Sequence, residues 1–210
     1  MRARIYYSKG IALKFTGTLD LQSIWQRSLK RAGLTVELSQ GFHPQPKIQL
    51  PFPLPLGFTA QNEIIDIWFA QDYALDDIRE KLTGSLPEGI EIQFIEPIDG
   101  QRKSIASSAT TADYKVIVDT AEISISDLKD SLGKLLESQT IIRERNNKQY
   151  DLRPLILSIQ IGDEMEGQYI LEMRLSAHPS TTGRPDEVMK ELGVNLVDCE
   201  IERLGVQFEN

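Results

Sequence analysis

The sequence predicts an α+β fold made of two ferredoxin-like (split βαβ) domains with antiparallel sheets, and three observations lead to this prediction. Strand-like alternation and helix-like periodicity follow one another in the order β-α-β-β-α-β between residues 2 and 95. Small polar residues without periodicity then fill positions 99–112, which is the composition of a linker. The same order of elements begins again at residue 113. We therefore expect a first domain at 1–98, a linker at 99–112 and a second domain at 113–210.

The first repeat opens with residues 2–8, where apolar and polar side chains alternate with the period of a half-buried strand. After a turn at 9–10, residues 11–15 continue the alternation and predict a second strand or a hairpin. A helix is expected from Thr18, as its N-cap, to Gly33 in the left-handed position behind its end. The other predicted elements of this repeat are strands at 35–39, 48–52, 63–70 and 89–95 and a helix at 73–85.

The second repeat follows the first in outline. A hairpin is expected across the acidic turn at 162–167, and Pro185 suits the first position of a helix. Cys199 alternates with Val197 and Ile201 in the last predicted strand, so we expect an inert core cysteine rather than a nucleophile. The predicted elements are strands at 113–119, 140–145, 155–161, 169–175 and 196–203 and helices at 126–137 and 185–192.

The charge of the chain is unevenly distributed. The formal net charge is −8, yet residues 1–60 contain eight lysines and arginines against two acidic residues. The remaining residues contain fifteen basic and twenty-nine acidic side chains. This asymmetry indicates either an anionic partner at the basic end or an attraction between the two halves.

Several kinds of site are excluded by composition. No apolar run is long enough to cross a bilayer, and the N-terminus lacks the apolar region of a signal peptide, so a cytoplasmic protein without a membrane partner is expected. One cysteine cannot form an internal disulfide or an all-cysteine metal site. The two histidines, His43 and His178, are far apart in sequence and have no metal-ligand spacing. Neither a metal nor another cofactor is expected.

Residues 39–57 hold five of the ten prolines. Because proline fixes φ and extends the residue before it, 41–47 should be a stiff irregular loop. The loop displays Phe42, His43 and Lys47. Phe42 could stack on a base or fill the space beneath the loop, and His43 could act as a general base, contact a phosphate, or bond a backbone carbonyl.

A second basic segment, residues 142–154, occupies the position in the second repeat that the proline-rich loop has in the first. If the repeats pack about a pseudo-twofold axis, both segments could line one phosphate-binding cleft, although pairing with Glu144 and Asp151 is the alternative. Arg184, at a predicted helix start, would add an anion contact. The candidate phosphate-binding residues are Arg27, Arg31, Ser39, Phe42, His43, Lys47, Arg143, Arg145, Lys148, Arg153 and Arg184.

Five short motifs of the chain stand out: KFTGTLDL at 14–21, LKRAGL at 29–34, SQGFHPQPKI at 39–48, PLG at 55–57 and DLRP at 151–154. Together they resemble an uncharacterised domain family described as radical-SAM-linked. Its members are fused to, or encoded beside, radical SAM proteins, often with a cobalamin-binding domain. The chain departs from the family pattern at Gly17-Thr18, where Ser-His is usual, and at Gln45, where an arginine is usual.

The resemblance implies association with a radical SAM enzyme and with RNA. Because the chain lacks the three-cysteine cluster motif, it would be an accessory protein that presents RNA, or another phosphate-bearing substrate, without catalysing a reaction itself. One alternative is a metal-independent RNA endonuclease with His43 as general base. The other is a protein–protein adaptor. The sequence does not indicate the ligand, the particular partner or the oligomeric state.

Overall fold

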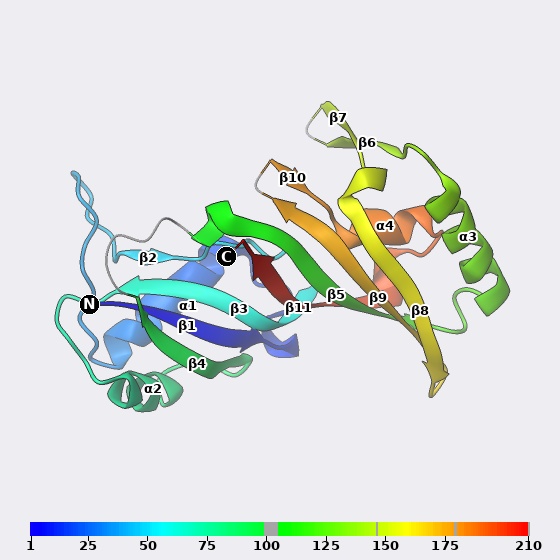
Figure 1. The fold of residues 1–210 in the computed structure, drawn as a ribbon. Helices are drawn as coiled ribbons and strands as arrows, with labels where there is room; N and C mark the ends of the chain where they lie inside the picture. Colours follow the sequence, from blue (N-terminus) through cyan, green and yellow to red (C-terminus); the bar gives the residue numbers. More distant parts are fainter. Residues whose placement is uncertain (99–104, 146, 179, 210) are drawn as a thin grey trace. The chain divides into compact units, whose positions relative to one another are not determined.

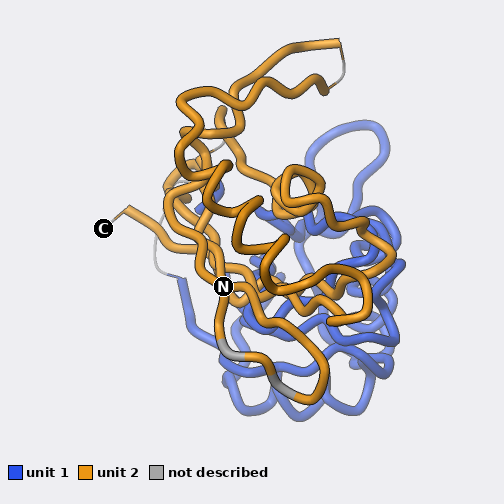
Figure 2. Tube along the Cα trace, turned by 90° about the vertical axis from the view of Figure 1, so that its right-hand side faces the viewer, with its two compact units in different colours: residues 1–106 blue, residues 107–210 orange. Residues whose placement is uncertain are grey.

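The computed structural model describes residues 1–98, 105–145, 147–178 and 180–209 (Figure 1). The chain divides into two units, residues 1–106 and 107–210 (Figure 2). The first unit has the β-α-β-β-α-β order of a ferredoxin-like fold, and the second unit has the same order with three further short strands inserted. Within each unit the strands pair antiparallel. The predicted fold class is therefore confirmed. The predicted linker lies partly outside the described residues, at 99–104.

In the first unit the antiparallel strands lie in the order β2-β3-β1-β4, which places the first and third strands at the centre. Arg4 lies directly opposite Asp66 across the central pair. The elements are β1 (Arg2–Lys9), α1 (Thr18–Arg31), β2 (Ile48–Gln49), β3 (Phe58–Trp68), α2 (Leu75–Thr83) and β4 (Ile90–Ile98).

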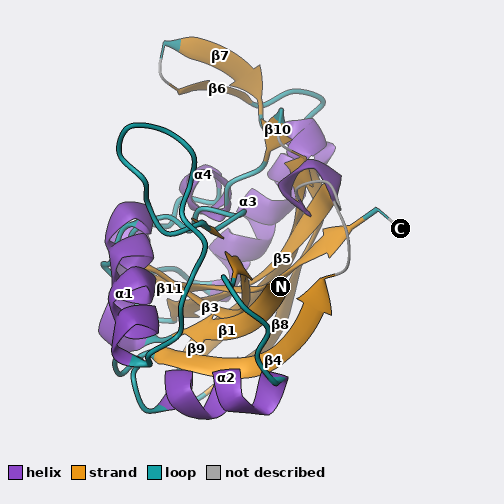
Figure 3. Ribbon diagram, turned by 90° about the vertical axis from the view of Figure 1, so that its left-hand side faces the viewer, coloured by secondary structure: helices purple, strands orange, loops and turns teal. Residues whose placement is uncertain are grey.

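One face of this sheet carries the core. Residues of both helices and of β1, β3 and β4 form a single buried cluster, so α1 and α2 cover the same face (Figure 3). Trp25 of α1 is fully buried and meets Tyr7 of β1 edge to face, with ring centroids 5.0 Å apart. Burying a large apolar side chain contributes about 1.5–3 kcal/mol, so this face anchors the unit.

The strand predicted at 11–15 is wrong. Residues Ile11–Leu13 form a short 3-10 helix, and the apolar side chains of Ile11 and Phe15 are exposed. The backbone groups of this segment bond locally, as in Leu13 N–H to the Gly10 carbonyl at 3.1 Å. The buried Lys9 ammonium also binds the Phe58 carbonyl at 3.2 Å, which holds the turn against β3. The local backbone hydrogen bonds of the turn therefore determine the conformation of this segment, and the alternation of apolar residues does not.

Helix α1 begins one residue earlier than predicted. Gly17, not Thr18, is the N-cap, and no side chain caps the helix there. The predicted C-terminal glycine is confirmed, since Gly33 has φ of +67°. Gly33 N–H donates to Lys30 carbonyl at 3.2 Å and Leu34 N–H to Leu29 carbonyl at 3.1 Å. These two bonds form a Schellman motif, which brings Leu29 and Leu34 together.

In the second unit the order is β8-β9-β5-β11, the same as in the first unit. The predicted hairpin between β8 and β9 is confirmed, with positive φ at Glu166 and Gly167 in the turn. The elements are β5 (Ala109–Asp119), α3 (Ile125–Glu137), β6 (Ile142–Arg145), β7 (Lys148–Asp151), β8 (Ile156–Met165), β9 (Gln168–His178), β10 (Thr181–Thr182), α4 (Pro185–Glu191) and β11 (Cys199–Phe208).

The basic segment of this unit forms a separate two-stranded sheet, the β6–β7 hairpin. Pro185 starts α4 as predicted. The last strand starts at Cys199 rather than residue 196, because 196–198 form a 3-10 turn. Val197 is consequently exposed instead of buried, whereas Cys199 is buried as expected.

None of the helices in the described part of the chain is both long enough and apolar enough to span a membrane.

Candidate nucleic-acid interface

The proline-rich segment forms a projecting loop, residues 38–46, which we call the finger loop (Figures 1 and 3). Ser39 N–H donates to the Gln45 carbonyl at 2.8 Å, and Gln45 N–H donates to the Ser39 hydroxyl at 3.0 Å. Leu38 and Pro46 form a bridge just below. The loop is therefore closed by hydrogen bonds at its base. The Ser39 hydroxyl accepts one of these bonds, so its own O–H can still donate to a phosphate.

Phe42 and His43 lie at the tip of the finger loop. The Phe42 side chain is 102% exposed, so it does not fill the space beneath the loop. Gly41 precedes it with φ of +130°, a conformation that favours glycine. His43 is also exposed and forms no hydrogen bond or ion pair within the described residues. A general base is normally oriented by a second group, so this geometry does not favour the endonuclease alternative.

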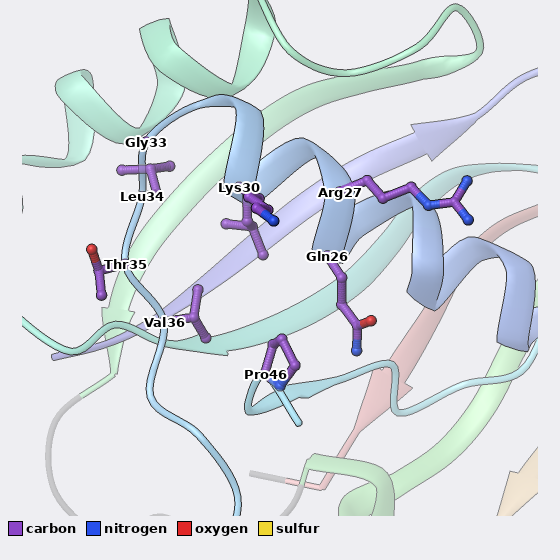
Figure 4. A pocket seen from close by; sticks show the side chains of 9 residues that line it. Gln26, Arg27, Lys30, Gly33, Leu34, Thr35, Val36 and Pro46 are labelled. Carbon is purple, nitrogen blue, oxygen red and sulfur yellow. The ribbon is translucent and has the colours of Figure 1, made fainter. Parts of the chain in front are cut away.

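A pocket of about 490 Å³ lies at the foot of the finger loop (Figure 4). Its walls are the C-terminal half of α1, the segment 33–36, and Pro46. Arg27 and Lys30 belong to its lining, and their side chains form no hydrogen bond or ion pair with any described residue. Figure 4 shows the Arg27 guanidinium extending along the helix, away from Pro46. The pocket therefore combines an apolar floor with two unneutralised cations.

Two other predicted cations of the first unit are already engaged. The Arg31 guanidinium donates to the Ser85 carbonyl at 2.7 Å, which ties the end of α1 to the end of α2. Lys47 pairs with Glu37 at 3.0 Å and lies 5.1 Å from the ring centroid of Trp68. The Lys47–Glu37 ion pair is exposed. Because an exposed ion pair contributes only about 0–1 kcal/mol, Lys47 would lose little free energy if a phosphate replaced Glu37 as its partner.

In the second unit, helix α4 neutralises part of the predicted site. Arg143 forms ion pairs with Glu187 and Glu191. Arg184 binds Asp186 through two hydrogen bonds, one of 2.8 Å from Nε, and this pairing raises the pKa of the guanidinium. The anion contact expected from Arg184 is therefore taken by a carboxylate of the chain itself.

The tip of the β6–β7 hairpin keeps two exposed cations. Arg145 and Lys148 lie directly opposite each other and form no ion pair within the described residues. Arg153, in contrast, donates to the Leu136 carbonyl at 3.2 Å and the Ile156 carbonyl at 3.3 Å. Asp151 accepts the Ile141 and Arg153 N–H groups rather than pairing with an arginine side chain. Arg153 thus connects the end of α3 to the start of β8.

The structure brings some predicted residues together. Arg27 lies beside the foot of the loop that carries Phe42 and His43. Sequence reasoning missed Lys30 as a site residue, although the Gly33-Leu34 helix end is the signal that folds the chain back to make a pocket there. Lys47 and Arg145 belong to different units, so the common groove stays a prediction.

Two further properties describe the chemistry of the region. Thr35 N–H donates to the Tyr73 hydroxyl at 3.0 Å, and this hydrogen bond lowers the pKa of Tyr73 because it stabilises the phenolate. Over the described residues, no three histidine, cysteine, aspartate or glutamate side chains gather in a way that could hold a metal ion.

The fold and these groups define a protein with two ferredoxin-like units and exposed cations beside a rigid aromatic loop. A family model described as an uncharacterized protein conserved in bacteria, DUF2344, matches residues 2–185. The match covers most of the sequence, so the chain belongs to this family. No curated protein sequence matches it.

Two solved structures share the fold. A chain from a crystal structure of a Cbf5-Nop10-Gar1 complex matches with a TM-score of 0.53 and 7% identity, over 97% of this chain and 48% of that chain. A chain from an H/ACA RNP bound to a substrate RNA containing 2′-deoxyuridine matches with a TM-score of 0.51 and 8% identity, over 97% and 47%. This chain spans about half the length of those chains, and at such identity the likeness shows the fold alone.

Proposed function

We propose that this chain is an accessory protein of a radical SAM enzyme that binds RNA, or another phosphate-bearing substrate, without catalysing a reaction itself. The observation that carries the RNA part is the fully exposed Phe42 at the tip of a hydrogen-bonded loop whose foot borders the pocket lined by the unneutralised cations Arg27 and Lys30. Single-stranded nucleic acids are bound by this combination of an aromatic platform and a basic surface. One of the two solved complexes that contain a chain of similar fold includes a substrate RNA, which supports the proposal of RNA binding.

Arg145 and Lys148 form a second candidate phosphate contact, within the second unit. Their like charges lie opposite each other at an exposed hairpin tip, where they gain nothing from one another. A bound phosphate would relieve that repulsion. Lys47 would also contact a phosphate, after breaking its ion pair with Glu37. The engaged residues Arg31, Arg143, Arg153 and Arg184 would hold the surrounding elements in place.

RNA binding is tested by fluorescence anisotropy with a labelled single-stranded oligoribonucleotide. Affinity should fall roughly tenfold or more between about 50 and 200 mM salt, because bound cations displace counterions. Phe42→Ala should weaken binding about fivefold or more without lowering thermal stability, since the side chain contacts solvent. Lys129→Gln, on the exposed part of α3, is the matched charge control and should change little. Absence of binding at low salt would refute the RNA proposal.

The accessory role also requires a surface for the partner enzyme. Large exposed apolar side chains surround the start of α1, which is unusual for a surface without a partner. A Cβ atom built on Gly57 would lie 3.9 Å from the Phe15 side chain, and one built on Gly17 would lie 3.8 Å from the Leu56 side chain. Phe15 thus lies beside residue 57 and Leu56 beside residue 17, so the two side chains belong to one patch. The exposed residues of this patch are Ile11, Phe15, Leu19 and Leu56.

The partner is tested by affinity purification of the tagged chain followed by mass spectrometry. The expected result is recovery of a protein with the three-cysteine motif of radical SAM enzymes. Phe15→Glu should abolish that recovery while leaving RNA affinity unchanged, whereas Phe42→Ala should do the reverse. Recovery that is equal in the wild type and in Phe15→Glu would contradict the docking surface.

A further inference from the structure

The pocket at the foot of the finger loop has a rigid, preformed apolar floor. Leu29 and Leu34 are almost completely buried and are held together by the Schellman bonds at the end of α1. Val36 and Pro46, from the two sides of the finger loop, complete the floor. About 490 Å³ lies within the range of sites that bind one small ligand or one ligand group.

The outer wall of the pocket is fixed by its backbone. Thr35 N–H donates to Tyr73, and the Thr35 carbonyl accepts from Ala70 N–H at 3.0 Å. The Thr35 side chain also interacts with Tyr73, so it is part of the wall. The Gln26 carboxamide, on the helix opposite (Figure 4), has no hydrogen-bond partner among the described residues. A carboxamide can both donate and accept, as the edge of a nucleobase requires.

The charges at the pocket have one sign. Lys30 and Arg27 stand one helical turn apart at i and i+3 on α1, and Glu37 is the nearby carboxylate that already pairs with Lys47. The carbonyls at the end of α1 accept the N–H groups of 32–34, so they do not neutralise these cations. An apolar floor with a cationic rim suits a flat group that carries a phosphate.

From this geometry we infer that the pocket binds a single unstacked nucleotide. The base would lie on Leu29, Leu34 and Pro46, with its edge facing the Gln26 carboxamide. Its phosphate would contact Lys30 and Arg27. This inference rests on the proposed RNA binding and adds to it a pocket for one base, distinct from stacking on Phe42. It predicts that the chain recognises unpaired nucleotides rather than a duplex, whose bases are inaccessible.

The test uses adenosine 5′-monophosphate as the probe, with adenosine and ribose 5-phosphate as comparisons, in NMR titrations of the full chain. Adenosine 5′-monophosphate should bind at least about tenfold more tightly than either fragment, because only it uses both floor and rim. Thr35→Trp should fill the pocket and weaken both the nucleotide and the RNA oligomer about tenfold. Thr35 is exposed, so this variant should retain the wild-type circular dichroism spectrum and thermal midpoint. Asp130→Trp, on the exposed side of α3, is the matched bulk control.

The outcomes separate the two proposals. RNA binding that is unchanged in Thr35→Trp, with no binding of adenosine 5′-monophosphate, would overturn the nucleotide pocket and leave the RNA proposal standing. Nucleotide binding that Thr35→Trp removes, in a chain that does not bind RNA oligomers, would support the pocket and overturn the RNA proposal. Binding of an acidic peptide in the pocket, without any binding of adenosine 5′-monophosphate, would overturn the nucleotide assignment in favour of a protein ligand.

Discussion

The two units place an arginine–aspartate pair at the same point of the fold but use it differently. In the first unit Arg4 of β1 lies opposite Asp66 of β3, and in the second unit Asp113 of β5 lies opposite Arg174 of β9. Both pairs join the first and third strands, with the charges exchanged. The Asp66 side chain is 1% exposed, whereas the Arg174 side chain is 52% exposed. Equal topology therefore does not imply equal energetic weight.

The surroundings explain this difference. Asp66 also accepts from Arg2, and Arg4 lies 3.9 Å from Glu96, so the first pair belongs to a buried network. Burial, the largest single influence, would lower the pKa of Arg4, but the hydrogen bonds and the charge attraction to Asp66, with smaller contributions from Tyr6, together outweigh it and raise the pKa. The second pair faces water, where each ion keeps its hydration. The two basic residues beside Asp66 thus serve the fold and are not part of the proposed RNA surface.

The largest expected effect is the difference in stability between two variants, each of which lacks the carboxylate of one pair. Asp66→Ala leaves two largely buried guanidinium groups without their partner and should lower the free energy of unfolding by about 3–5 kcal/mol. Asp113→Ala should change it little. Urea unfolding followed by tryptophan fluorescence reports the first unit, because Trp25 and Trp68 both belong to it, and circular dichroism reports the whole chain. Equal losses in the two variants would contradict the distinction.

A smaller effect distinguishes two arginines in the β6–β7 hairpin. Arg143→Ala breaks the pairing with α4 and should lower stability by about 1 kcal/mol or less, without reducing RNA affinity. Arg145→Ala should leave stability unchanged and lower the salt dependence of RNA binding by about one contact. Thermal unfolding and anisotropy titrations check the two properties separately. A loss of RNA affinity in Arg143→Ala alone would reverse this assignment.

The smallest expected effect is the pH dependence that Tyr6 contributes in the first unit. Burial, followed by the 2.9 Å hydrogen bond to Glu96, raises the pKa of Tyr6. Above pH of about 10 the unfolded chain loses the tyrosine proton before the folded chain does, so the free energy of unfolding falls as pH rises. Tyr6→Phe should remove this part of the decline. Urea titrations at several alkaline pH values measure it, and identical slopes in both proteins would show that Tyr6 does not contribute.

The sequence was sufficient to predict the fold class, because each repeat keeps its periodicities in the same order. Glycine and proline positions were the most reliable local signals, as at Gly33 and Pro185. Alternation misled at 11–15 and at Val197, where the chain forms 3-10 turns whose backbone bonds are local. An apolar side chain at such a turn has no strand to direct it inward, so it stays exposed.

The candidate site could be predicted only in part. The type of residue was visible, but the partner of each cation depends on contacts distant in sequence, such as Arg143 with Glu191 or Arg31 with Ser85. Phe42 could be predicted to lie on a stiff loop, but not to be fully exposed. The pocket beside Lys30 arises from the packing of α1 against the foot of the finger loop, which no local pattern encodes.

The finger loop leaves and rejoins the fold at a single point. Glu37 N–H donates to the Trp68 carbonyl at 2.7 Å, Trp68 N–H donates to the Lys47 carbonyl at 3.1 Å, and Lys47 N–H donates to the Glu37 carbonyl at 2.7 Å. Three backbone segments are thus locked together at the root of the excursion. Changes in the length or sequence of residues 39–45 are consequently insulated from the core, so the tip of the loop can be altered without disturbing the scaffold beneath it.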